Sequence, residues 1–224
     1  RDDGRLAEAA EAVAAALEAA PERLEAAPDP DSLRLAVDAV AADLFRSGRV
    51  ADAAAFLRRI CAAHDANGDW MNNLGFFLRE LGVAAQEQGD PAAQDHFEES
   101  WLAYSRAVEL APEDARIVND RALIAVYYLD EHWELAEREL HRSIALGSQQ
   151  LAEFPADVPL TEHRYVDEAV GDAWENLAYL QLIRRHQTDR VQEYLDESIQ
   201  HYPFARRNGV ALLRTRLAEV RREP

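Results

Sequence analysis

Apolar residues spaced three or four positions apart, interrupted by helix breakers, constrain the fold of this chain more than any other feature. The spacing recurs between residues 69 and 146 and is the pattern of one face of an α-helix. Its first run comprises Trp70, Leu74, Phe77, Leu78 and Leu81. A breaker follows at residues 88–91, where glycine can end one helix and proline fits the first turn of the next. The second run stops before Pro112, since residues that precede proline avoid the helical region, so the stretch predicts two antiparallel helices.

Pairs of such helices repeat along the chain. We predict pairs over residues 31–66, 69–112, 114–147 and 172–203, with a long connection over residues 148–171. The connection is rich in apolar residues, so it either packs over neighbouring helices or contacts a partner. Tandem helix pairs that pack on their neighbours form a solenoid. The predicted fold is therefore all-α, a single helical-repeat domain over residues 1–224 built as a right-handed α-solenoid of antiparallel helix hairpins.

The ends of the predicted helices carry recognisable signals. Asp69, Asp90 and Asp114 are expected N-caps, because a carboxylate accepts hydrogen bonds from the first N–H groups of a helix. Residues 1–30 predict an alanine-rich helix and a linker at residues 28–30; this helix either covers the solenoid or pairs with another chain. Residues 204–224 predict a C-terminal capping helix. Its inward residues are expected to be Leu212, Leu213, Leu217 and Val220.

Each predicted pair resembles a tetratricopeptide repeat, which has a small residue on the first helix, an aromatic residue or leucine and an alanine on the second, and a closing proline. In the second pair the matching residues are Leu74, Gly75, Tyr104, Ala107 and Pro112. The other pairs match at Gly48, Ala53 and Leu57, at Ala122, Ala136 and Leu140, and at Trp174, Leu177, Ala178, Leu195 and Pro203. The positions that depart from the family pattern are Ser100, Ser143 and Ser198, where alanine is usual, and Arg121, where an apolar residue is usual. The resemblance covers roughly residues 31–203.

The resemblance implies a concave groove lined by the first helices of successive pairs. The residues expected to face it are Asn72, Asn73, Phe76, Arg79, Arg116, Asn119, Asp120, Tyr127, Asn176 and Tyr179. Asparagine suits a peptide-binding surface because its amide both donates and accepts hydrogen bonds, and arginine can bind a carboxylate with two parallel hydrogen bonds. The alternative is that the asparagines cap or bridge adjacent helices. Family members that grip a C-terminal carboxylate use lysines, which this chain lacks, so we do not predict that clamp.

The charge balance narrows the class of partner. The chain has 42 acidic and 24 basic residues, a net charge of −18, and all its basic residues are arginine. This charge disfavours nonspecific binding to nucleic acid or to anionic lipid and favours a protein or peptide partner that is basic. The absence of lysine fits a GC-rich bacterial coding sequence, and salt adaptation would also give an acidic chain. The longest apolar run, residues 122–129, is too short to cross a bilayer, so we expect no membrane insertion.

No motif predicts catalysis or a cofactor. The sequence lacks a phosphate-binding glycine loop, a His-Glu-x-x-His zinc motif and a paired Cys-x-x-Cys. Cys61 lies among apolar residues and is expected in the core. The acidic stretch over residues 162–172 is expected to be solvated surface rather than a metal site, because metal ligands must converge. We therefore expect no catalytic residues, no metal and no cofactor.

The predicted function is a noncatalytic scaffold that binds a peptide or a partner segment in the concave groove. The alternative is a structural or oligomerisation segment of a larger multidomain protein, since the chain begins at Arg1 without an initiator methionine and reads as cut or processed. Under that alternative a homo-oligomer is left open. An enzyme built on acid–base carboxylates is the third hypothesis, and we disfavour it because no motif supports it. The expected compartment is the cytoplasm.

Overall fold

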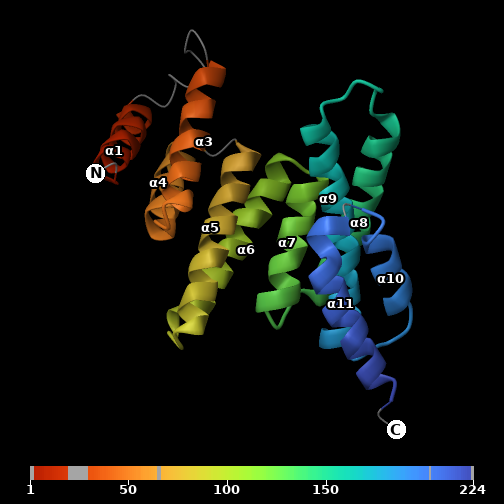
Figure 1. The fold of residues 1–224 in the computed structure, drawn as a ribbon. Helices are drawn as coiled ribbons and strands as arrows, with labels where there is room; N and C mark the ends of the chain where they lie inside the picture. The colour runs from red at the N-terminus through yellow and green to blue at the C-terminus, as the bar shows by residue number, and fades with distance from the viewer. Residues whose placement is uncertain (1–2, 20–29, 65–66, 202, 223–224) are drawn as a thin grey trace. The chain divides into compact units, whose positions relative to one another are not determined.

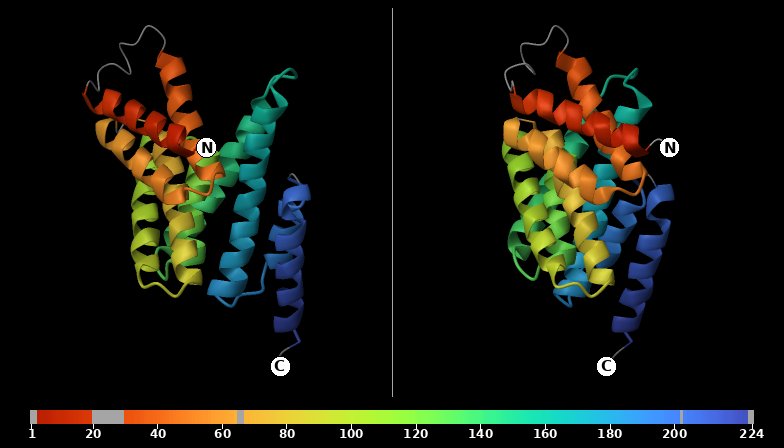
Figure 2. Two further views of the ribbon diagram at one scale, coloured as in Figure 1. Left: turned by 60° about the vertical axis from the view of Figure 1, so that its left-hand side comes forward. Right: turned by 90° about the vertical axis from the view of Figure 1, so that its left-hand side faces the viewer.

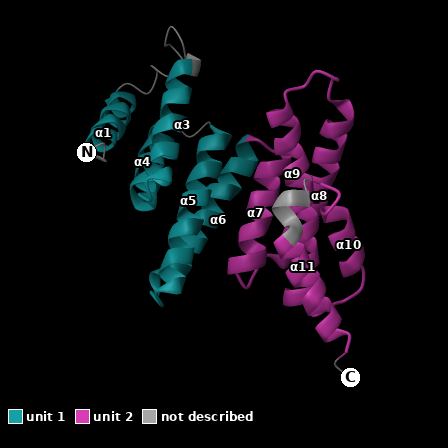
Figure 3. Cartoon of the chain, viewed as in Figure 1, with its two compact units in different colours: residues 1–110 teal, residues 111–224 magenta. Residues whose placement is uncertain are grey.

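A computed structural model describes residues 3–19, 30–64, 67–201 and 203–222, and all regular secondary structure within them is helical (Figure 1). This confirms the all-α prediction. The helices are α1 (Asp3–Ala19), α3 (Pro30–Arg46), α4 (Val50–Ala63), α5 (Gly68–Glu87), α6 (Ala92–Leu110), α7 (Ala115–Tyr128), α8 (Trp133–Glu153), α9 (Leu160–Tyr179), the π-helix η1 (Leu180–Arg184), α10 (Val191–Ser198) and α11 (Pro203–Val220). Contacts divide the chain into two compact units, unit 1 (residues 1–110) and unit 2 (residues 111–224), coloured separately in Figure 3. The single repeat domain over residues 1–224 stays a prediction.

Unit 1 packs α1 and α3 to α6 around one apolar core. The turn between α3 and α4 depends on Gly48, whose φ of +75° is a conformation that glycine adopts without a steric penalty. Helix α1 lies against α4 in both views of Figure 2 and contributes Leu17 to the core. Of the two arrangements considered for the N-terminal helix, the structure therefore shows the one in which it packs on its own chain. Residues 20–29, which include most of the predicted linker, lie outside the described residues.

Helices α5 and α6 pack closely side by side because small residues of α5 face bulky ones of α6. A Cβ atom at Gly75 would lie 2.7 Å from the ring of Tyr104, and one at Gly82 would lie 2.5 Å from the ring of Phe97. The buried hydroxyl of Ser100 donates a hydrogen bond to the Gly75 carbonyl oxygen at 2.7 Å. Each glycine thus makes room for an aromatic ring, and the serine joins the two backbones.

Unit 2 repeats this serine contact in its own helix pairs. Ser143 of α8 donates to the Ala115 carbonyl oxygen of α7 at 2.7 Å, and Ser198 of α10 donates to the Gly171 carbonyl oxygen of α9 at 2.9 Å. All three serines are fully buried. Helix α9 also packs on α7 and on α8, so the first helices of the two predicted pairs in this unit are neighbours.

The predicted connection over residues 148–171 is wrong. Helix α8 continues to Glu153 and α9 begins at Leu160, leaving a short link that contains two prolines. Gly147, interpreted from the sequence as the end of a helix, lies inside α8, where its missing side chain accommodates Val170 of α9. The apolar residues that made the connection unusual do not form a core: Leu160 is 81% exposed, and the others are partly or fully exposed, namely Leu151, Phe154, Pro155, Val158 and Pro159. The buried residues of the predicted connection come from α9 and include Val166, Ala169 and Val170.

Two predicted helix starts are confirmed and one is shifted. The Asp114 carboxylate accepts hydrogen bonds from the backbone N–H groups of residues 116 and 117, and Asp90 accepts one from residue 92. The N-cap of α5 is Asn67 rather than Asp69, since the Asn67 side chain accepts from Trp70 N–H at 3.0 Å. In α11 the predicted inward Leu212 is 71% exposed, because Val210, Leu213 and Leu217 make the buried face.

Candidate functional site

The predicted groove residues lie on α5 in unit 1 and on α7 and α9 in unit 2. In unit 1, Asn73 and Phe76 line a cavity of about 240 Å³ between α3 and α5, which we call the α3–α5 pocket. Its lining consists of Asp38, Ala41, Ala42, Phe45 and Arg46 from α3 and Asn73, Phe76 and Phe77 from α5. Asn72 and Arg79 lie on α5 beside the pocket and do not line it.

One wall of the α3–α5 pocket is aromatic. The ring centroids of Phe45 and Phe76 are 5.0 Å apart in an edge-to-face arrangement, and those of Phe45 and Phe77 are 5.4 Å apart. The guanidinium of Arg79 lies 4.8 Å from the centroid of the Phe76 ring and forms an ion pair with Glu80. Such aromatic pairs stabilise each other beyond their buried area, so this wall is held in place before anything binds.

Asp38 supplies the carboxylate of the pocket. Its Oδ1 atom accepts a hydrogen bond of 2.9 Å from the indole Nε1–H of Trp70, whose side chain is buried. Partial burial raises the pKa of Asp38, and the Trp70 hydrogen bond only partly offsets that rise. A carboxylate that has lost part of its water while remaining ionised favours a nearby cation or hydrogen-bond donor.

Sequence reasoning missed the α3 side of this pocket. The prediction assigned groove residues to the later pairs and none to the first helix of the first pair, residues 33–45. A signal was present, because Asp38, Ala41, Ala42 and Phe45 follow helical spacing and share one face. The Asp38–Trp70 contact joins residues 32 positions apart, which no local pattern reveals.

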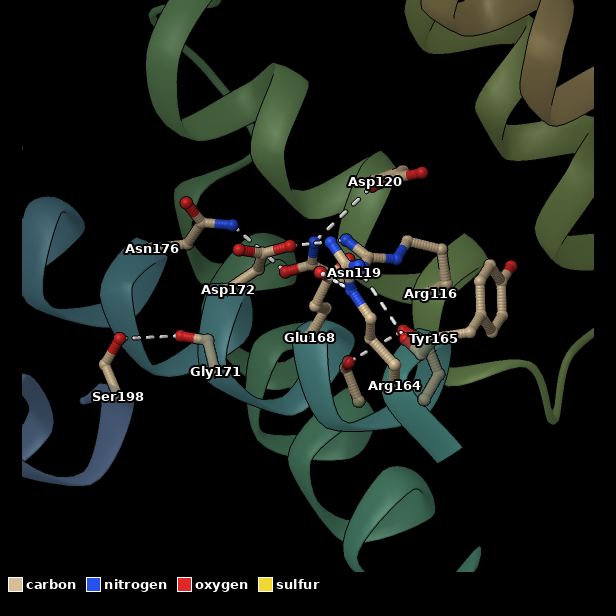
Figure 4. A network of polar contacts seen from close by, with 12 residues as sticks. Arg116, Asn119, Asp120, Arg164, Tyr165, Glu168, Gly171, Asp172, Asn176 and Ser198 are labelled. Atoms are coloured by element: carbon tan, nitrogen blue, oxygen red, sulfur yellow. Dashed lines mark hydrogen bonds and ion pairs between the residues drawn. The ribbon is translucent and has the colours of Figure 1, made fainter. Parts of the chain in front are cut away.

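In unit 2 the predicted asparagines contact each other instead of facing solvent. The Asn176 amide donates to the Asn119 side-chain oxygen at 3.0 Å, and the two residues are 4% and 0% exposed (Figure 4). Buried amides need partners, and here each provides one for the other across α7 and α9. The two asparagines thus bridge adjacent helices, which is the alternative given in the sequence analysis. We therefore exclude Asn119 and Asn176 from the candidate binding surface.

Arg116 of α7 holds α9 through several contacts. Figure 4 shows its guanidinium between the carboxylates of Asp172 and Glu168 and the backbone of Tyr165. Burial alone would lower the pKa of Arg116, but the carboxylates of Asp120 and Asp172 outweigh burial and raise it. Arg116 and Asp120 are therefore engaged within unit 2.

The predicted Tyr127 and Tyr179 are also engaged with each other. Their ring centroids are 4.2 Å apart between α7 and α9. Burial raises the pKa of Tyr127, and the nearby carboxylate of Glu175 raises it further. Both residues are partly exposed, so the contact between α7 and α9 reaches the surface, but the cavity lined by predicted residues lies in unit 1.

Two further observations concern metal ligands and the one thiol of the described residues. Among those residues, no three His, Cys, Asp or Glu side chains converge as metal ligands would. Burial raises the pKa of Cys61 to about 12, which keeps its thiol protonated and unreactive. Among the described helices, none combines the length and the apolar character needed to cross a bilayer.

Comparison of the sequence with models of protein families finds no match, and a search of curated proteins finds none either.

Proposed function

We propose that this protein is a noncatalytic scaffold that binds a short segment of a partner protein in the α3–α5 pocket. The observation that carries the proposal is the cavity itself, which is lined by two predicted groove residues, Asn73 and Phe76, and by an aromatic wall. Its volume of about 240 Å³ is below the roughly 300–1,000 Å³ of small-molecule sites. The pocket therefore suits a single anchoring side chain, and the Asn73 amide can both donate to and accept from a peptide backbone.

We further propose that the helix pairs are tetratricopeptide-like hairpins arranged as a right-handed solenoid. Three equivalent hydrogen bonds support this, since Ser100, Ser143 and Ser198 each join the second helix of a pair to the backbone of its first helix. In such a solenoid α3 and α5 are successive first helices, so the α3–α5 pocket belongs to the groove-lining face.

A display selection tests the proposed function. Seven-residue random peptides are selected on the wild-type chain and then measured by fluorescence anisotropy against an Asn73→Ala, Phe76→Ala double variant. Ala42→Leu is a second variant, which fills the pocket without removing any packing. The control is Tyr165→Ala, which removes a partly exposed aromatic side chain from unit 2. Circular dichroism verifies that each variant is folded.

We expect the selected peptides to lose affinity for both pocket variants by at least about tenfold, or about 1.4 kcal/mol, and to keep it for the control. Selection of no peptide, or equal binding to wild type and to Ala42→Leu, would contradict the proposal.

A second function, self-association, is favoured by one apolar surface of unit 1. A cavity of about 260 Å³ over α4, α5 and α6 has Met71, Leu74 and Leu78 in its floor and Leu102, which is 66% exposed, at its edge. Apolar surface of this kind often marks a protein interface. Light scattering decides the matter: a dimeric mass that falls to the monomer mass in Leu102→Glu would support self-association, and a monomeric wild type would exclude it.

A further inference from the structure

The α3–α5 pocket contains one carboxylate that forms no ion pair with another described residue. Two charged residues line the cavity, Asp38 and Arg46. Arg46 is ion-paired with Asp43 on its own helix, whereas Asp38 bonds to the neutral indole of Trp70. Within the described residues no guanidinium pairs with Asp38, so its carboxylate is the lining's one charged group outside an ion pair.

The geometry around Asp38 leaves one oxygen for a ligand. Trp70 occupies Oδ1, and Oδ2 remains as a hydrogen-bond acceptor for a group entering the cavity. Asp38 stays accessible to an incoming group, since the residue is exposed, while the partial burial that raises its pKa strengthens its attraction to a cation relative to a fully solvated carboxylate.

The aromatic wall selects among cations. A guanidinium is planar and weakly hydrated, so it stacks on aromatic faces and forks onto carboxylates, whereas an ammonium is a compact and strongly hydrated point charge. The chain already shows such a contact at this wall, where the Arg79 guanidinium lies 4.8 Å from the centroid of the Phe76 ring. Ala41 and Ala42 leave room for an aliphatic stem.

We infer that the α3–α5 pocket binds an arginine side chain of the partner segment. The guanidinium pairs with Asp38, and its methylene stem packs against Ala42 and the ring of Phe45. This inference rests on the proposed function and names the chemistry of its anchor. It also agrees with the net charge of −18, which raises the rate of encounter with a basic segment.

The indole N–H of Trp70 provides a direct reporter, because it donates to the carboxylate in question. The experiment titrates N-acetyl-arginine amide into the full ¹⁵N-labelled chain and follows the four tryptophan indole resonances. Trp70→Phe assigns the Trp70 signal, and the other three serve as internal controls. N-acetyl-citrulline amide has the shape of the arginine compound without its charge, and N-acetyl-leucine amide tests a purely apolar anchor.

We expect the arginine compound to shift the Trp70 resonance with an affinity at least about fivefold higher than that of the citrulline compound. Asp38→Asn removes the charge and keeps an oxygen that accepts from Trp70, so it should abolish the difference between the two compounds. Ala42→Leu fills the cavity and should abolish all three shifts.

Equal shifts with arginine and citrulline, preferential binding of the leucine compound, or no shift with any compound would each overturn the inference. The display selection judges the proposed function separately: selected peptides that lack arginine would leave the scaffold function standing while rejecting this anchor.

Discussion

The hydroxyl of Ser100 donates a 2.7 Å hydrogen bond to the carbonyl oxygen of Gly75, joining α6 to α5 at a point where both residues are buried. The same contact joins Ser143 to Ala115 and Ser198 to Gly171. Serine adds a hydroxyl to the methyl carbon of alanine, and a buried hydroxyl needs a partner. In each pair the facing carbonyl oxygen accepts its hydrogen bond. Serine can therefore replace the usual alanine at these positions, because the neighbouring helix offers a carbonyl oxygen to its hydroxyl.

Ser100→Ala should lower the free energy of unfolding by about 1 kcal/mol, the usual net value of one intramolecular hydrogen bond. The carbonyl oxygen of Gly75 keeps its place in the α5 ladder, so no acceptor is stranded. Urea unfolding followed by circular dichroism measures the change. Ser148→Ala, on the exposed face of α8, is the control and should change stability by less than about 0.5 kcal/mol.

Gly75→Ala should destabilise unit 1 although alanine is the better helix former. The new Cβ would lie 2.7 Å from the Tyr104 ring, and relieving such overpacking costs about 1–3 kcal/mol. Gly4→Ala in α1 is the matched control, because no heavy atom outside its own helix surroundings lies within 4 Å of the added Cβ. A thermal melt that shows Gly75→Ala as stable as wild type would refute the close approach of the two helices.

Arg121 occupies a position where an apolar residue is usual, and it forms an ion pair there with Glu139. The pair joins α7 to α8 and includes a 2.6 Å hydrogen bond. Glu139 is 4% exposed, so Arg121→Met leaves a buried carboxylate without its cation and should cost about 3–5 kcal/mol. Replacing both, with Arg121→Met and Glu139→Leu, should return the free energy of unfolding to within about 1 kcal/mol of wild type. A double variant as unstable as Arg121→Met alone would show that packing, not charge, governs this position.

Asp38 should make stability depend on pH. The pKa of Asp38 is raised in the folded state above its ordinary value of 3.8, so its contribution to stability is present below that value and is lost as pH rises through the folded pKa. Asp38→Asn stays neutral throughout. Relative to wild type, the variant should therefore gain stability as pH rises from below 3.8 through the raised pKa of Asp38, as measured by urea unfolding at each pH. A difference that is constant over this range would contradict the raised pKa.

Cys61 should resist thiol reagents. Its buried thiol has a pKa raised to about 12, and only the thiolate attacks such reagents. Labelling with a disulfide reagent in native buffer should proceed orders of magnitude more slowly than in denaturant. Rapid labelling of the folded chain would place the thiol at the surface.

Helix positions were largely predictable because local spacing and breakers determine them. The periodicity from Trp70 to Leu81 and the cap at Asp114 correspond to α5 and α7. The prediction at Gly147 was wrong because glycine occurs both at helix ends and where two helices approach closely. Here the glycine makes room for the Cγ2 methyl group of Val170, which lies on another helix. The α3–α5 pocket was only half predictable for the same reason: its walls come from helices separated in sequence, and Asp38 acquires its role only when Trp70 lies beside it.

The raised pKa of Asp38 means that ionisation of its carboxylate opposes folding, and a cation bound beside it would offset that effect. Residues that lower the stability of a folded protein are common at functional sites, where they contribute to binding or activity. If the arginine anchor is correct, Asp38→Asn should be both the more stable and the weaker binder.

The buried amides of Asn119 and Asn176 set the alignment of α7 and α9 in a way that apolar contacts cannot. A helix that slides by one turn, about 5.4 Å, can bring leucine and valine against other apolar neighbours, so these side chains resist the slide less strictly than a hydrogen-bonded pair does. Sliding would break the hydrogen bond from Asn176 to Asn119 and strand its buried donor and acceptor away from water, at a cost of about 1–3 kcal/mol for each stranded group. The hydrogen-bonded asparagine pair therefore favours a single alignment of α7 with α9.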